Sequence, residues 1–258
     1  MKTLIIKNIL KVFWNVIIII ESSVFEMEEL IYIENENLAN YIMFKLDKID
    51  NGFTEKELNK ITEVVIDYNN ENESSFVFLK ELLKLKNLKI ITLRNGYIFN
   101  NNFSIFLSLN NLSEFVFENC EFENADLIVS LKLKSLSLIN CIINSLTFIN
   151  LLENLEELSI VNGTIEIGKI NTLNHLRYLQ ISYSKITDSK ELNISTLEEL
   201  YIDNTNINNY NFLNDLLNLK KISIDENQYN NNKELFNNLI NRNILVLNEN
   251  MVEFGGEN

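Results

Sequence analysis

The chain has 258 residues with 36 acidic and 22 basic side chains, which gives a net charge of −14. Such acidity argues against a nucleic-acid partner, because binding to phosphates requires basic patches. It also argues against simple adsorption on anionic membrane surfaces.

Residues 1–25 begin with three spaced lysines and continue into the apolar run Val12–Ile20. This order is similar to the charged and apolar regions of a signal peptide, although no Ala-x-Ala cleavage site follows. The run is shorter than the roughly 20 residues that span a bilayer. We expect an export signal or membrane anchor, with any membrane contact made through residues 1–20. The alternative is an amphipathic or β segment packed against the part of the chain that follows.

A helical N-terminal cap is predicted over residues 26–60. Apolar residues recur there at helical spacing, at Leu38, Tyr41, Ile42 and Leu46. Thr54 and Glu57 form the T-x-x-E pattern of a capping box, which satisfies free amides at a helix start. Such a segment would cover a sheet edge that would otherwise be prone to aggregation. The alternative is any helical hairpin packed on the end of the repeats.

An eightfold repeat follows over residues 61–230. Each unit has an apolar residue, two variable residues, a second apolar residue, one variable residue and a third apolar residue. Successive units lie 21 to 27 residues apart, and their first apolar positions are Ile61, Leu88, Leu112, Leu133, Leu155, Leu176, Leu197 and Leu219. A period of about 20–29 residues with this pattern indicates a solenoid, whose units bury their apolar faces by stacking on one another.

Each unit is predicted to form a short strand followed by a turn of α- or 3₁₀-helix. In the clearest unit, Leu200 and Ile202 point inward and Tyr201 points outward, because side chains alternate along a strand. Later apolar positions have a wider spacing and are predicted to cover the convex side, as at Phe212, Leu213 and Leu216.

Residues 231–258 are expected to form a C-terminal cap. The pattern predicts a helix over Asn232–Asn241 and a final degenerate strand at Leu245 and Leu247. Terminal units of a solenoid are atypical because their outer faces must be polar.

The motif resembles the leucine-rich-repeat family over residues 61–229, in particular the short 22-residue class of internalin-like bacterial proteins and some protein-phosphatase regulators. Its departures are a polar insert at Asn70–Ser75 and phenylalanine at positions 115 and 117 in place of leucine. The resemblance implies an α/β solenoid: a horseshoe of about eight repeats with a parallel sheet on the concave face and helical caps. It also implies binding by an extended surface.

The outward strand positions give a candidate binding face, because eight of them are acidic and only two are basic. We expect apolar and aromatic groups in the middle of this face to form one strip at the centre of a protein interface, since such anchors concentrate affinity. Acidic neighbours would favour a partner with a basic surface. The candidate partner-binding residues are Val116, Glu118, Ile139, Val161, Tyr178, Tyr201 and Asp203.

Cys120 and Cys141 occupy the ninth position of adjacent units. In the leucine-rich-repeat family this position holds a small buried residue that faces the backbone of the next coil, so we expect two buried free thiols. A disulfide is the alternative, because neighbouring strands lie about 4.8 Å apart. His175 is expected to be an exposed turn residue, and no cofactor, metal site or catalytic motif is expected.

A column of asparagines occupies the eighth position of several units, at Asn95, Asn119, Asn140, Asn162 and Asn204. Tyr68 and Tyr183 fill two of its gaps. Asparagine tolerates unusual backbone angles and forms local hydrogen bonds, so a structural role is favoured over a binding ladder.

These features favour a non-enzymatic module that binds protein through its concave face, secreted or envelope-associated rather than cytoplasmic. The alternatives are an intracellular regulator of an enzyme such as a phosphatase or toxin, a subunit of an enzyme whose catalytic domain lies on another chain, and a purely structural role. The link to a cell surface rests on resemblance of fold alone.

Overall fold

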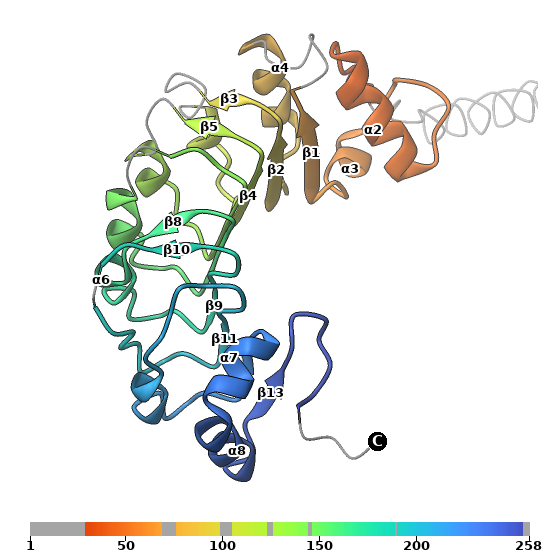
Figure 1. Ribbon diagram of the computed structural model, residues 1–258. Helices are drawn as coiled ribbons and strands as arrows, with labels where there is room; N and C mark the ends of the chain where they lie inside the picture. Colours follow the sequence, from red (N-terminus) through yellow and green to blue (C-terminus); the bar gives the residue numbers. More distant parts are fainter. Residues whose placement is uncertain are drawn as a thin grey trace, which may run out of the picture.

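The chain forms a curved solenoid in a computed structural model that describes residues 29–68, 76–98, 105–122, 126–143, 146–188 and 190–254. One parallel sheet lines the inner side of the arc, and short helical segments lie on its outer side (Figure 1). This is the α/β leucine-rich-repeat architecture predicted from the spacing. The predicted signal or anchor at residues 1–25 and the insert Asn70–Ser75 lie outside the described residues.

Nine strands form the inner sheet within the described part of the chain. Neighbouring strands pair in parallel and in register, so that equivalent positions of successive coils lie side by side. In spatial order the strands are β1 (Glu63–Asp67), β2 (Ile90–Arg94), β4 (Glu114–Glu118), β6 (Ser135–Ile139), β7 (Glu157–Val161), β9 (Tyr178–Gln180), β11 (Glu199–Tyr201), β12 (Lys221–Ser223) and β13 (Leu245–Leu247).

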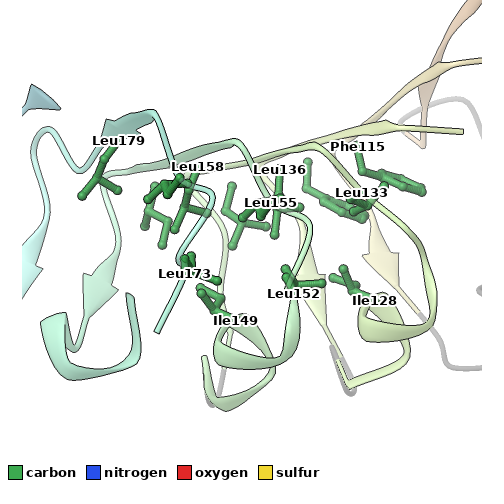
Figure 2. Packing of buried hydrophobic residues seen from close by; sticks show 14 of the residues in the cluster. Phe115, Ile128, Leu133, Leu136, Ile149, Leu152, Leu155, Leu158, Leu173 and Leu179 are labelled. Carbon is green, nitrogen blue, oxygen red and sulfur yellow. The ribbon is translucent and has the colours of Figure 1, made fainter. Parts of the chain in front are cut away.

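The core lies between the sheet and the outer segments. Inward strand residues such as Leu136 and Leu158 are fully buried and point toward Ile149 and Leu152 on the outer side (Figure 2). A coil cannot bury these side chains without a neighbour, so each coil contributes to the stability of the next. The outer segments are α4 (Phe76–Glu81), η1 (Leu82–Lys84), η2 (Asp126–Ser130), η3 (Thr147–Leu151), α6 (Ile167–Ile170) and η4 (Asn211–Asn214).

Two helices cover the N-terminal end of the sheet, α2 (Glu36–Leu46) and α3 (Glu55–Leu58). The Tyr41 hydroxyl of α2 donates to the backbone carbonyl of Glu63 in β1, which draws the helix onto the edge strand. The predicted capping box is present: the Thr54 side chain accepts from the amide of Glu57, and the Glu57 carboxylate accepts from the amide of Thr54. This end of the sheet is therefore covered rather than open.

Helices α7 (Glu226–Asn231) and α8 (Lys233–Asn241) precede the last strand at the other end. The helix predicted over Asn232–Asn241 corresponds to α8, whose Phe236 and Leu239 are buried. The final strand is β13, whose edge forms an antiparallel bridge between Leu247 and Glu253. The chain thus folds back over its own edge strand after the last turn.

Two small sheets join the inner strands to the outer segments: β3 (Tyr97–Ile98) with β5 (Glu121–Phe122), and β8 (Thr164–Ile165) with β10 (Lys185–Ile186). Among the described residues, no strand follows β10 in this sheet. Instead, the Asn206 side chain accepts from the amide of Ile186 at 2.7 Å and donates to its carbonyl at 2.9 Å. One amide side chain thereby replaces the backbone of a missing strand.

Four asparagines of the column form, with Asp67, a continuous hydrogen-bonded ladder along the edge where the strands end, and Asn204 lies beyond it. Each side-chain amide donates to the preceding coil at 2.9–3.0 Å, in the order Asn162 to Asn140, Asn140 to Asn119, Asn119 to Asn95 and Asn95 to Asp67. These asparagines also have left-handed backbones, with φ between 54° and 56° at Asn95, Asn140 and Asn162 and 53° at Asn119. The structure therefore confirms the structural role of the column, since asparagine adopts this conformation readily.

The change Asn140→Ala should lower the free energy of unfolding by about 1–2 kcal/mol, because it removes two amide hydrogen bonds and places alanine in a left-handed conformation. The matched variant Asn140→Gly keeps the backbone relaxed and should lose less. Urea unfolding of the two variants measures the difference. Equal losses would mean that the backbone conformation contributes nothing at this position.

Both cysteines are free, as expected, so the disulfide alternative is wrong in this structure. The Sγ atoms of Cys120 and Cys141 lie 3.4 Å from the carbonyl oxygens of Leu93 and Phe117, respectively. The thiols thus face the preceding coil, whereas the family pattern predicted the next one. Cys120 is buried as predicted, but Cys141 is only partly buried, so that part of the prediction is wrong. His175 lies exposed in a turn, as predicted.

The two thiols should react slowly with a disulfide reagent such as dithionitrobenzoate at pH 8. Burial raises the pKa of Cys141 to about 12 and also raises the pKa of Cys120, so the reactive thiolate is scarce in the folded chain. Unfolding in urea should restore ordinary thiol rates, which a stopped-flow absorbance trace would record. Fast labelling of the native chain would contradict the burial of these two thiols.

Candidate functional site

The concave face of the inner sheet presents three rows of outward side chains, because the strands are in register. The first row is Glu63, Ile90, Glu114, Ser135, Glu157, Tyr178, Glu199 and Lys221. The middle row is Val65, Thr92, Val116, Ser137, Ser159, Gln180, Tyr201 and Ser223. The last row is Asp67, Arg94, Glu118, Ile139 and Val161, continued at the equivalent positions Ser182, Asp203 and Asp225.

The predicted apolar groups all lie on this face, but they do not form a single strip. Val116 is in the middle row, whereas Ile139 and Val161 are neighbours in the last row. Tyr178 is in the first row and Tyr201 in the middle row. The expectation of one central strip is therefore wrong, because these residues occupy different positions of the repeated strand.

Two tyrosines form the aromatic part of the face. The rings of Tyr178 and Tyr201 lie 5.1 Å apart between centroids. The Tyr178 hydroxyl donates to Gln180 at 3.2 Å, and the Tyr201 hydroxyl donates to Glu199 at 2.9 Å. Burial raises the pKa of both phenols, and the neighbouring carboxylates raise the pKa of Tyr178 further, so both remain protonated donors at neutral pH. Tyr201 is only 7% exposed, so it supports the surface more than it projects from it.

Lys221 is already engaged beside this pair. Its ammonium nitrogen lies 5.1 Å from the ring centroid of Tyr201 and 3.3 Å from the carboxylate of Glu199. A cation over an aromatic ring and next to a carboxylate is stabilised by both groups. Glu118 is similarly engaged, with an oxygen 2.6 Å from Nε of Arg94. This predicted binding residue already has a partner within the chain.

Glu114 and Glu157 make no ion pair with any described residue. They lie in the first row on either side of Ser135. Two strand spacings of about 4.8 Å place their backbones about 10 Å from each other. Burial raises the pKa of Glu114, and the carboxylates of Glu157 and Glu63 raise it further. A cation brought by a partner would relieve this unfavourable environment.

The edge of the sheet where the strands begin carries alternating charges. Oxygens of Glu156 and Glu198 accept from Lys134 at 2.7 Å, Arg177 at 2.6 Å and Lys220 at 2.5 Å. Hydrogen bonds to Lys134 and to Lys220 hold the pKa of Glu156 and of Glu198, respectively, below the usual range. This edge satisfies its own charges, in contrast to Glu114 and Glu157.

Tyr183 interrupts the asparagine ladder and is a residue that the sequence interpretation did not select. Its backbone is left-handed, with φ of 56°, and its side chain is 53% exposed. A bulky residue in this conformation costs about 1–2 kcal/mol relative to asparagine or glycine. The sequence indicated this exception, because four earlier coils have asparagine at the position that Tyr183 occupies.

Neither a metal-binding cluster nor a membrane-spanning helix occurs in the described part of the chain. Residues 29–254, apart from the short gaps, contain no group of three or more histidine, cysteine or acidic residues arranged to hold a metal ion. Among the same residues, no helix combines the length and apolar character needed to cross a bilayer.

Comparison with solved structures relates the fold to bacterial proteins of the same architecture. Internalin C2 from Listeria monocytogenes is 18% identical, with 75% of this chain and 94% of that chain covered and a TM-score of 0.52. The internalin InlF from the same species is 14% identical, with 76% and 90% covered and a TM-score of 0.36. No protein-family model and no curated protein matches the sequence. The likeness to internalin C2 shows a shared solenoid fold.

Proposed function

Because the chain folds as an internalin-like leucine-rich-repeat solenoid, we propose that it is a non-enzymatic module that binds a protein with a basic surface through its concave face. The observation that carries the proposal is the pair of carboxylates, Glu114 and Glu157, that have no cation among the described residues. Apolar groups lie on the same strands: Val116 with Glu114 in β4, and Val161 with Glu157 in β7.

The arrangement suits a partner that brings cations to the first row and apolar groups to the last row. Ile139 and Val161 are half-buried neighbours that would lose the rest of their exposed area on contact. The unpaired carboxylates would raise the association rate and make it sensitive to salt. Tyr183 adds an exposed aromatic side chain at the edge where the strands end, next to Ser182 of the last row.

Site-specific photo-crosslinking tests the assignment of the face. Benzoylphenylalanine would be placed at Val116 and at Val161 on the concave face, and at the exposed Leu151 of η3 on the outer side as a matched control. We expect one polypeptide from the source cells or their surroundings to crosslink from both concave positions and not from position 151. Its yield should fall as salt rises. Equal crosslinking from Leu151 would overturn the proposal.

Secretion or attachment to the envelope remains part of the proposal and depends on residues 1–25. A mature chain that begins near residues 22–30, identified by its N-terminal mass in the medium or envelope fraction, would support export. An intact Met1 in the cytosol would instead favour the alternative of an intracellular regulator that binds an enzyme through the same face.

A further inference from the structure

Asp203 is a mostly buried residue in the last row of the concave face, and its carboxylate oxygens are not among the enclosed polar atoms. It is 5% exposed, and its carboxylate forms no hydrogen bond or ion pair with any described residue. Its backbone is hydrogen-bonded: the Asp203 carbonyl accepts from the amide of Tyr183 at 3.0 Å. A carboxylate on the concave face that has no cation within the chain is free to accept hydrogen bonds from a cation that a partner brings.

Ser182 lies directly beside Asp203, on the concave-facing position of the neighbouring coil. It is 2% exposed, and its Oγ atom has no hydrogen-bond partner among the described residues. Buried hydroxyl groups are almost always hydrogen-bonded in folded proteins. Two unsatisfied polar groups at adjacent positions of one row therefore mark a single incomplete site.

The neighbours of this pair favour a positive charge. On the far side, Asp225 is already satisfied, because its two oxygens accept from the amides of Gln228 and Asn204. The nearby cation Lys221 is engaged by Glu199 and the Tyr201 ring. The site therefore contains two carboxylates and no described cation that is free to pair with Asp203.

We propose that Asp203 and Ser182 receive the guanidinium group of one arginine side chain of the protein partner. A guanidinium donates two parallel hydrogen bonds to a carboxylate, a planar geometry that an ammonium group cannot offer. The Ser182 hydroxyl is enclosed in the free chain, and a change of its rotamer would let it accept a further N–H. This inference rests on the proposed function and adds to it the residue type that fills the most buried part of the face.

Titration of the full-length, isotope-labelled protein with N-acetylarginine amide tests the site by nuclear magnetic resonance. We expect saturable shifts confined to the amides of residues 178–184 and 199–204. N-acetylcitrulline amide has nearly the same shape without the charge, and it should produce no saturable shift. Shifts of equal size with citrulline, or arginine-dependent shifts located elsewhere, would overturn the proposal.

The variant Asp203→Asn should weaken binding of N-acetylarginine amide at least tenfold, whereas Glu153→Gln, an exposed acid outside the three rows, should change it less than twofold. Thermal unfolding checks that the asparagine variant folds, and its melting temperature should not fall, because the carboxylate makes no hydrogen bond or ion pair with any described residue. A marked drop in melting temperature would overturn the proposal, since it would reveal a partner for Asp203 inside the chain.

The two proposals fail separately. If the partner still crosslinks from positions 116 and 161 with unchanged affinity for Asp203→Asn, the arginine site is wrong and the concave-face assignment stands. If N-acetylarginine amide binds at Asp203 while crosslinks come from the outer position 151, the site is correct and the proposed face for the protein partner is wrong.

Discussion

Replacing Glu81 with alanine is expected to lower the free energy of unfolding by about 2–4 kcal/mol, because it removes a buried acid with several partners. Glu81 is 6% exposed at the end of α4. One carboxylate oxygen accepts from the amides of Glu34 and Asn35 at 2.5 and 3.1 Å, and the other pairs with Lys84 at 2.5 Å. The side chain therefore joins the start of α2 to the first coil.

Two variants separate this role from a general charge effect. Glu81→Gln retains an oxygen that can accept from the two amides and should lose only part of the stability. Glu55→Ala removes one partner of an exposed pair with Lys86 and should leave stability nearly unchanged. Urea unfolding gives the free energies, and amide exchange in α2 should accelerate only when Glu81 is changed. Equal unfolding midpoints for the parent chain and Glu81→Ala would contradict the contact.

Phe115→Ala is expected to cost about 3–5 kcal/mol, in the range for an aromatic side chain deleted from a core. Phe115 is fully buried in β4. Its ring stacks on Phe117 at 4.5 Å between centroids and meets the edge of Phe106 at 5.0 Å. The cavity would open in the middle of the stack of coils, where neighbours on both sides lose contacts.

The matched variant Phe115→Leu introduces the residue found at this position in several other coils. It should cost about 1–2 kcal/mol, because leucine leaves a smaller cavity than alanine. Calorimetry or urea unfolding would measure both variants. In a solenoid each unit contacts only its neighbours, so amide exchange should increase most in β2, β4 and β6. A uniform increase along the whole chain would contradict this local description.

Much of the fold could be predicted because its signals repeat. The leucine spacing placed each inner strand, and Thr54 with Glu57 placed the start of α3. The asparagine column indicated a structural edge, although its hydrogen-bonded ladder required the observed register. One signal was overlooked: Asp225 and Gln228 form a capping box that begins α7, and the same spacing rule would have found it.

The candidate site was harder to predict, for two different reasons. Counting positions along each strand places Ile139 and Val161 in a different row from Val116. The incorrect prediction of a single apolar strip was therefore avoidable. The burial of Asp203 and the unsatisfied hydroxyl of Ser182 could not be found by counting, because they depend on how side chains of neighbouring coils fill space. Periodicity gives the direction of a side chain but not the partners that it lacks.

The unbroken ladder from Asp67 to Asn162 has a consequence for how such a chain can vary during evolution. The first coil is 27 residues long and a later one is 21, yet the ladder joins all of these coils without a gap. In the sequence, the extra residues of the longer coil come after the ladder position. Insertions and deletions can accumulate there while the inner face keeps its spacing, so recognition residues can diversify independently of coil length.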